Sequence, residues 1–310
     1  MKSFVKLCLF LFILSLNLLC KSQTSICIYD TSYIINDLNH ILYAISNDSM
    51  GGRPAGSLYE IKTINFLLDN ILNFLPNNYE ITIDEFYYYY NNDLVIAHNI
   101  SILPKDDSIP IFLLTAHYDH LRQGSFYSRE IINKNQIHPG ADDNASGVSL
   151  AVELFKILFS NKYIDTLYPK PALILFSGHE EGMHGSDEWI CKYNKLYDID
   201  FIINFDMVGR MDDNESILLL RHAENETTLN DNLFKNCINN AKKSNINLRY
   251  TDEGFRQTDS YNFYINKIPS YTMSTGIHPD YHRVSDTPDK INYKSIYKII
   301  LSLYNQIFDT

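Results

Sequence analysis

Five short motifs of this chain concentrate histidine and carboxylate side chains. These are the groups that hydrolytic zinc binds, at about 2.0–2.2 Å. A pair of catalytic ions also needs a carboxylate that binds both, and in a His-x-Asp motif the Asp can accept a hydrogen bond from the ligand imidazole. The residue types therefore predict metal-assisted hydrolysis. The motifs are His117-Tyr-Asp119-His120, Gly140-Ala-Asp142-Asp143-Asn144-Ala-Ser-Gly147, Ser177-Gly-His179-Glu180-Glu181, Asp206-Met207-Val-Gly209 and His278-Pro-Asp280-Tyr-His282.

The cysteines do not suit a thiolate metal site or a disulfide framework. The chain has five, and beyond its first 22 residues only Cys27, Cys191 and Cys237 remain. They are odd in number and widely spread, and there is no Cys-x-x-Cys motif. Any zinc must therefore be bound by histidines and carboxylates.

Apolar segments of strand length directly precede three of the motifs. Residues 111–116 lead into His117, residues 172–176 lead into Ser177, and residues 201–205 lead into Asp206. Nearly unbroken apolar character is typical of strands that are covered on both faces. In open α/β sheets, ligands bind at the carboxyl ends of the strands. The polar motifs therefore lie where a site is expected.

Segments with helical periodicity alternate with these strands. We expect helices within residues 57–75, 147–158, 186–193 and 229–243, and a further strand at Phe86–Tyr90. Alternation of strands and helices predicts an α/β fold, a three-layer α/β/α sandwich around a mixed, largely parallel central sheet. There is no linker, so residues 27–310 are predicted to form one domain.

Taken together, the motifs resemble those of the two-zinc aminopeptidases of the aminopeptidase S and aminopeptidase Y type. Glutamate carboxypeptidases, glutaminyl cyclases and the transferrin receptor ectodomain share that fold. The similarity runs from the Gly51–Ser57 motif to Asp286–Ile291, and the stretch Thr275–His282 is highly specific to the group. The resemblance implies the zinc exopeptidase fold, two zinc ions, and peptide or small protein substrates with a free N-terminus.

The resemblance also implies a role for each matching residue. His117 and Asp206 would bind one zinc, Glu180 and His282 would bind the other, and Asp143 would bridge both ions. Asp119 would orient His117. Gly140 and Gly147 would shape the tight turns on either side of the bridging acid.

One segment departs from the family pattern, in which a general-base Glu directly precedes a zinc-binding Glu. An ungapped match between Phe176-Ser-Gly178 and Gly182-Met-His-Gly185-Ser186 puts His179 at the base position and Glu180 at the ligand position. A one-residue shift would instead make Glu180 the base and Glu181 the ligand. We favour the ungapped match, because the shift requires compensating changes on both flanks. An imidazole that titrates near about pH 6.5 can serve as a general base.

The implied reaction is amide hydrolysis by a zinc-bridged hydroxide, with His179 or a Glu of the 180–181 pair as the base. Two alternatives stay open. One is a glutaminyl cyclase with a single zinc, and the other is a binding module of the same fold with weak or no catalysis. The His117-x-Asp119 and Asp143 motifs together favour two ions and an enzyme.

The amino-terminal residues predict export. Lys2 and Lys6 precede an apolar stretch, Leu7 to Leu19, that is too short to span a bilayer and suits a signal peptide at residues 1–22. Cys20 follows a loose lipoprotein-type box, so both simple secretion and lipid attachment stay open, with a secreted, periplasmic or cell-envelope location. The net charge of −11 argues against nucleic acid as a partner and leaves a lipid anchor at Cys20 as the only membrane contact expected.

Overall fold

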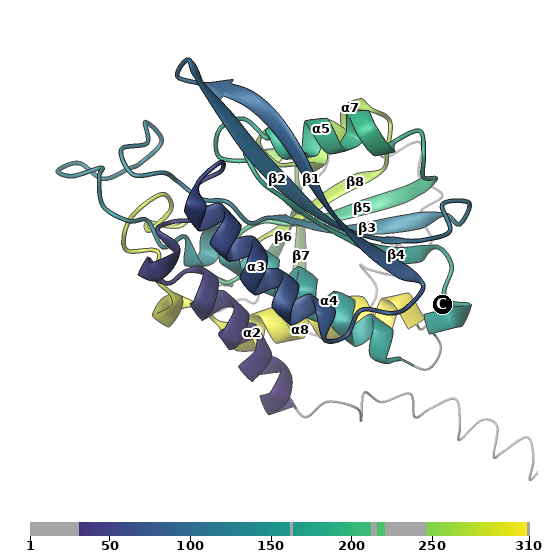
Figure 1. Ribbon diagram of the computed structural model, residues 1–310. Coiled ribbons are helices and arrows are strands. Elements are labelled where there is room, and N and C mark those ends of the chain that lie inside the picture. Colours follow the sequence, from purple (N-terminus) through teal and green to yellow (C-terminus); the bar gives the residue numbers. More distant parts are fainter. Residues whose placement is uncertain (1–30, 162–163, 212–215, 221–245, 309–310) are drawn as a thin grey trace, which may run out of the picture. The chain divides into compact units, whose positions relative to one another are not determined.

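The computed structural model describes residues 31–161, 164–211, 216–220 and 246–308 (Figure 1). The described residues from Ile35 onward form one compact unit. The predicted signal peptide at 1–22 with Cys20, the predicted start of the domain at residue 27, and the predicted helix at 229–243 lie outside the described residues. Within the described part of the chain, no helix is long and apolar enough to cross a membrane.

The described strands form one mixed sheet in the order β1-β2-β4-β3-β5-β8-β6-β7. Its centre is parallel, because β3 pairs in parallel with β4 and β5, and β5 pairs in parallel with β8. The β1–β2, β2–β4 and β6–β8 pairs are antiparallel, and β6 pairs in parallel with β7. The strands are β1 (Tyr79–Tyr90), β2 (Asp93–Pro104), β3 (Ile111–His117), β4 (Lys170–Phe176), β5 (Ile199–Phe205), β6 (Ser216–Leu220), β7 (Asn247–Thr251) and β8 (Ser270–Ser274).

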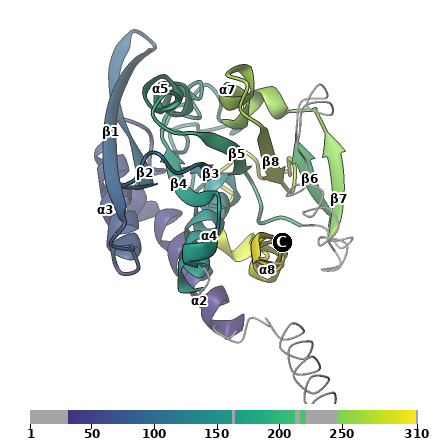
Figure 2. The same ribbon diagram turned by 90° about the vertical axis from the view of Figure 1, so that its right-hand side faces the viewer.

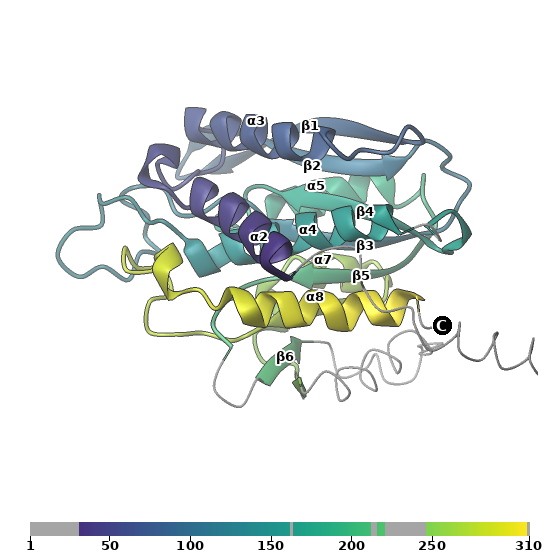
Figure 3. The ribbon, with the colours of Figure 1, turned by 90° about the horizontal axis from the view of Figure 1, so that it is seen from below.

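Helices cover both faces of the sheet. Figures 2 and 3 show α3, α4 and α8 on one face and α5 and α7 on the other. This arrangement confirms the predicted three-layer α/β/α architecture. The helices are α2 (Thr31–Ile45), α3 (Leu58–Leu72), α4 (Gly147–Ser160), α5 (His184–Tyr193), α7 (Ser260–Ile265) and α8 (Tyr293–Phe308), with short helical turns at Asp48–Met50, Ile164–Thr166, Phe255–Gln257 and Pro288–Lys290.

The burial of the central strands explains why their sequences are almost entirely apolar. Every residue of β3 is buried, and so is every residue of β4 after Lys170. Side chains of these strands pack with Trp189 and Ile190 of α5 and Phe263 of α7 in one core cluster. Strands covered on both faces need apolar residues at consecutive positions. The three predicted strands and the helices predicted within 57–75, 147–158 and 186–193 are confirmed.

Candidate active site

Three adjacent parallel strands end at the same edge of the sheet and carry polar residues there. His117 is the last residue of β3, the segment containing Glu180 follows β4, and Asp206 directly follows β5. A tight turn at Ala141–Ser146 precedes α4 and brings in Asp143, while the loop after β8 brings in His282. The structure therefore gathers all five predicted ligands at the carboxyl end of the sheet.

Asp143 lies between two pairs of ligand-type side chains. Its Oδ1 is 3.5 Å from Nε2 of His117, and that nitrogen is 3.7 Å from Oδ1 of Asp206. Its Oδ2 is 3.2 Å from Nε2 of His282, and that nitrogen is 3.2 Å from Oε2 of Glu180. Two donor atoms on one tetrahedral zinc at about 2.1 Å lie roughly 3.4 Å apart. Both pairs therefore have the spacing of zinc ligands, and Asp143 is common to them.

Several of the converging atoms are buried without a hydrogen-bond partner among the described residues. They include Nε2 of His117, Nε2 of His282, Oδ2 of Asp143 and Oε1 of Glu180. A buried polar atom left unpaired costs roughly 1–3 kcal/mol, so a cluster of them in a native fold calls for a ligand. A cation bound among these nitrogen and oxygen atoms would satisfy all of them, and the residues present therefore fit zinc.

The outer nitrogens of the two imidazoles are held by backbone carbonyls. Nδ1 of His282 donates to the carbonyl oxygen of Tyr127 at 3.0 Å, and Nδ1 of His117 donates to that of Asp119 at 3.2 Å. The Asp119 carboxylate, 3.7 Å away, instead accepts from the backbone N–H groups of His179 and Glu180. Asp119 was predicted to orient His117 through its side chain. In the structure the hydrogen bond to the imidazole is accepted by the backbone oxygen of Asp119, while its carboxylate lies 3.7 Å from the same nitrogen and holds the 179–180 turn.

The charges within the cluster are mutually stabilised. Burial opposes charge on His282, but the carboxylates of Glu180 and Asp143 outweigh it and raise the pKa of His282 to about 11. Burial also opposes charge on Asp143, yet His117 and His282 hold its pKa well below the usual value. The Asp143 carboxylate is thus ionised at neutral pH and can bind a cation.

Glu180 and Glu181 point to different surroundings. The Glu180 carboxylate joins the cluster, whereas that of Glu181 accepts hydrogen bonds from Tyr88 at 2.7 Å and from Arg122. Both partners of Glu181 lie outside the ligand group. The structure therefore disagrees with the shifted match, in which Glu181 would bind zinc, and gives Glu181 no place among the catalytic groups.

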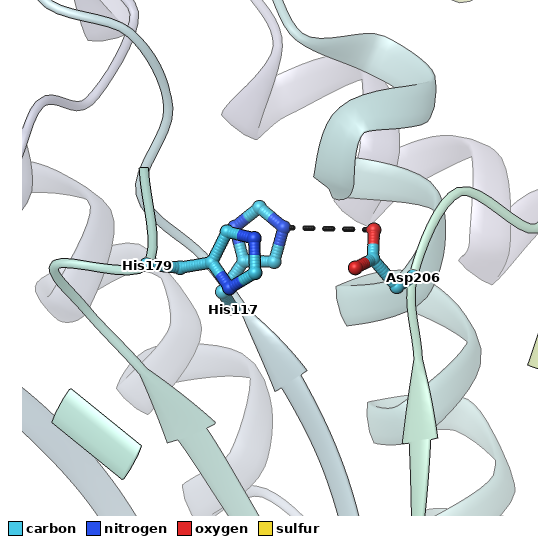
Figure 4. A group of neighbouring side chains, drawn as sticks. All are labelled: His117, His179 and Asp206. Carbon is cyan, nitrogen blue, oxygen red and sulfur yellow. Dashed lines mark ion pairs between the residues drawn. The ribbon is translucent and has the colours of Figure 1, made fainter. Parts of the chain in front are cut away.

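His179 lies beside His117 and Asp206, and the three offer ligand-type atoms within 4.8 Å of one another (Figure 4). The rings of His179 and His117 are stacked, with centroids 3.8 Å apart and an angle of 10° between their planes. An imidazole binds a metal ion close to the plane of its own ring. Two nearly parallel stacked rings therefore do not converge on one ion, which separates His179 from the ligands.

Two residues near the cluster were missed by sequence reasoning. Nδ1 of His120 is 2.7 Å from Oε1 of Glu180 and 3.9 Å from Oδ2 of Asp143. Its position three residues after His117, in the same motif, could have identified His120 as a site residue. Asp259, which contacts His179, follows no apolar strand and belongs to none of the five motifs.

Glycines and one arginine shape the loops behind the cluster. Gly140 has a φ of +56°, and a Cβ there would lie 2.3 Å from the carbonyl oxygen of Asp143. A Cβ on Gly147 would lie 2.3 Å from the carbonyl oxygen of Phe205. The fully buried Arg53 donates to the carbonyl oxygens of Tyr118, Pro139 and Gly140. The glycines thus occupy the turns predicted for them, and Arg53 joins the segment that follows His117 to the turn that carries Asp143.

A cavity of about 590 Å³ opens beside the cluster. Four residues of the cluster region line it, together with hydroxyl, apolar and acidic side chains from the segments around β7 and β8. The lining residues are Asp143, His179, Glu180, Asp206, Met207, Thr251, Glu253, Gly254, Gln257, Thr258, Thr272, Ser274, Gly276, Ile277 and Tyr281. The cavity is therefore a place for a substrate to meet the ligand cluster.

Comparison with known families decides the broad identity of the chain. The model of the family described as "Peptidase family M28" matches residues 99–305. This chain belongs to peptidase family M28. Membership of this family confirms the resemblance to zinc aminopeptidases and their relatives that the motifs predicted.

Individual relatives of this M28 chain are distant. A "Probable zinc metalloprotease" of Pyrenophora tritici-repentis is 31% identical over 110 residues, which are 34% of this chain and 20% of that protein. The matched region thus spans about a fifth of the length of such curated relatives.

Solved structures show the same fold at low identity. A leucine aminopeptidase precursor from Bacteroides thetaiotaomicron has a TM-score of 0.71 at 18% identity, covering 89% of this chain and 97% of that one. A glutaminyl cyclase from the same species has a TM-score of 0.70 at 18% identity, covering 89% and 98%. The fold is therefore shared by both kinds of protein and does not choose between them.

Proposed function

We propose that this chain is a two-zinc aminopeptidase that removes N-terminal residues from peptides or small proteins. The observation that carries the proposal is the position of Asp143, whose two oxygens face different ligand pairs. His117 and Asp206 lie on the Oδ1 side, and His282 and Glu180 lie on the Oδ2 side. A carboxylate shared in this way is what a two-ion site requires.

His179 is proposed as the general base of this site. Zinc bound here would polarise the scissile carbonyl and lower the pKa of an attacking water. His179 lines the cavity next to these ligands. Its ring is stacked nearly parallel to that of His117, so the two rings do not point at the same ion. From that position its neutral imidazole can accept the proton of the water and return it to the leaving amine. Burial and His117 oppose charge on this ring, but Asp259 outweighs them and raises the pKa of His179 to about 9, so the neutral form gains toward alkaline pH.

The charge of the cavity supports a free amino terminus as the group that is recognised. Asp143, Glu180, Asp206 and Glu253 contribute carboxylates to its lining, and none of its described lining residues is Lys or Arg. A cleft lined by negative charge concentrates cations, so it favours the α-ammonium group of a peptide over a C-terminal carboxylate.

The test compares free and blocked substrates. Purified protein is assayed on a panel of aminoacyl p-nitroanilides and on the same compounds with an acetylated amino group. The proposal expects hydrolysis of the free series only, its loss with a chelator, and its return when zinc is added. Equal hydrolysis of the acetylated series would contradict an aminopeptidase. Ring closure of glutaminyl peptides without anilide hydrolysis would identify a glutaminyl cyclase instead, and full zinc loading without any turnover would identify a binding module.

We also propose that the chain is exported, on the strength of the basic and apolar segment before Cys20. Cell fractionation should find a shortened chain outside the cytoplasm. Labelling with a palmitate analogue, compared between the natural chain and Cys20→Ser, separates a lipid-anchored form from a free one. Full-length chain in the cytoplasm would contradict export.

A further inference from the structure

Asp259 is a fully buried carboxylate that contacts His179 from a distant part of the chain. Its Oδ2 is 3.0 Å from Nδ1 of His179, and its Oδ1 accepts a hydrogen bond from Ser186 at 2.6 Å. We infer that Asp259 is a positioning residue, which fixes the ring orientation and the tautomer of His179. This inference rests on the proposed function, in which His179 is the base.

The hydrogen-bond chemistry determines which nitrogen of His179 is free. An ionised carboxylate only accepts hydrogen bonds, so Asp259 requires the proton of a neutral His179 ring to be on Nδ1. The lone pair is then on Nε2, the nitrogen that has no part in the contact with Asp259. A base must present a lone pair to the proton that it removes. Asp259 therefore keeps the imidazole in the tautomer that can act.

The other contacts of both residues hold this geometry in place. Asn262 of α7 donates to Oγ of Ser186 at 2.9 Å. The Ser186 hydroxyl has two acceptors within reach, and Oδ1 of Asp259 at 2.6 Å is nearer than the carbonyl oxygen of Met183 at 3.1 Å. On the other side, the His179 ring stacks on His117 at 3.8 Å. The imidazole is thus bounded by a carboxylate at its edge and by a ligand ring on its face.

A purely structural role is not supported by the surroundings of Asp259. It stands at the amino-terminal end of α7, where an Asp commonly caps the helix, but its side chain makes no capping hydrogen bond. Both carboxylate oxygens are used by His179 and Ser186 instead. A buried carboxylate is costly unless it is paired, and the imidazole is the ionisable group that it pairs with.

The experiment uses the zinc-loaded full chain and the isosteric variant Asp259→Asn. The Asn amide can donate to Nδ1 and so favours a proton on Nε2. Nitrogen-15 NMR at one fixed pH at which the His179 ring is neutral reads its tautomer, and the signals are assigned by their loss in His179→Ala. Steady-state kinetics, zinc content and thermal unfolding are measured on the same samples. Asp252→Asn, an exposed acid of the same segment, is the matched control.

We expect the Nδ1–H tautomer in the natural chain and a shift toward Nε2–H in Asp259→Asn. The variant should keep its zinc and a KM within about threefold, while kcat falls by about 10²-fold or more, the lower end of what a general base supplies. In a His179→Ala background, Asp259→Asn should change kcat less than about threefold.

Two outcomes would overturn the inference: an Nε2–H tautomer in the natural chain, or the same loss of kcat from Asp259→Asn in both backgrounds. The tautomer of the natural chain decides the question even when the variant does not fold. The same tautomer also tests the role of Asp259 when no peptidase activity is found. Failure of this inference can therefore be told apart from failure of the proposed function.

Discussion

Three consecutive residues, His179, Glu180 and Glu181, have three different surroundings. His179 faces the cavity and Asp259, Glu180 joins the ligand cluster, and Glu181 is held by Tyr88 and Arg122. At this scale, function depends on which side chain of a short segment reaches the cluster. A shift of one residue would replace a bound group with an unbound one, because a ligand must lie within roughly 2.2 Å of its ion.

Substitution of these three residues separates their roles. Glu180→Gln should lose metal affinity, because a neutral amide replaces a charged ligand. Glu181→Gln should have a mild effect on both zinc and rate. His179→Ala should keep its zinc and lose about 10²–10⁴-fold in kcat, as expected on removal of a general base. Zinc content and initial rates of the three proteins are the measurement. Loss of zinc in Glu181→Gln, with zinc retained in Glu180→Gln, would restore the shifted match.

The five predicted ligands lie together in the structure, whereas their supporting contacts were not predicted, for a physical reason. His117 and Asp206 follow buried strands, and the unbroken apolar character of such strands is visible in the sequence. Asp259 is 80 residues from His179, and only the packing of α7 beside α5 brings them together. Whether the backbone or the side-chain oxygen of Asp119 accepts the hydrogen bond from His117 is determined by backbone geometry. No residue pattern specifies that geometry.

At the scale of elements, the turn between Gly140 and Gly147 positions the bridging carboxylate. It receives support from Asn144, which donates to the carbonyl oxygen of Phe205 and accepts from the backbone N–H of Gly147. The turn thus docks directly on the end of β5, whose next residue is Asp206. The helical pattern of residues 147–158 predicted α4. The antiparallel neighbours in the sheet were not assigned, because the places of β2 beside β4 and of β6 beside β8 depend on long-range pairing.

Gly147→Ala tests the fit of this turn. The added methyl group would lie 2.3 Å from both Phe205 O and Oδ1 of Asn144, and one of these contacts is with backbone that cannot move away cheaply. We expect overpacking to cost about 1–3 kcal/mol of unfolding free energy and to lower zinc content, because Asp143 moves with the turn. Denaturant unfolding and metal analysis measure both effects. Ser160→Ala, at the far end of α4, is the control, and a Gly147→Ala protein with normal stability and zinc would refute the proposed docking.

At the scale of the whole molecule, the free energy of unfolding should depend on pH through Glu153. This residue is a buried acid of α4 and is none of the predicted zinc ligands. Burial is the main cause that raises its pKa to about 7, against the opposing effect of Lys156. The folded-state pKa therefore lies above the usual value of 4.5. The contribution of protonated Glu153 to the free energy of unfolding is fully present below about pH 4.5. It is lost as the pH rises through about 7.

Glu153→Gln removes this dependence. The substitution should raise the unfolding free energy above pH 7, by up to about 3 kcal/mol if the whole pKa shift is realised, and should flatten the stability profile between about pH 4.5 and 7. Denaturant unfolding of both proteins across that range, with zinc held constant, gives the comparison. Parallel profiles would show that Glu153 does not titrate differently in the folded state.

The proposed reaction depends on one carboxylate, that of Asp143, which would join two zinc ions. Its most direct test is the zinc content per chain of the purified natural protein and of Asp143→Ala, measured by elemental analysis after dialysis. We predict two equivalents in the natural chain and at most one in the variant, whose activity is abolished. A single equivalent in the natural chain, or two equivalents with normal turnover in Asp143→Ala, would contradict it.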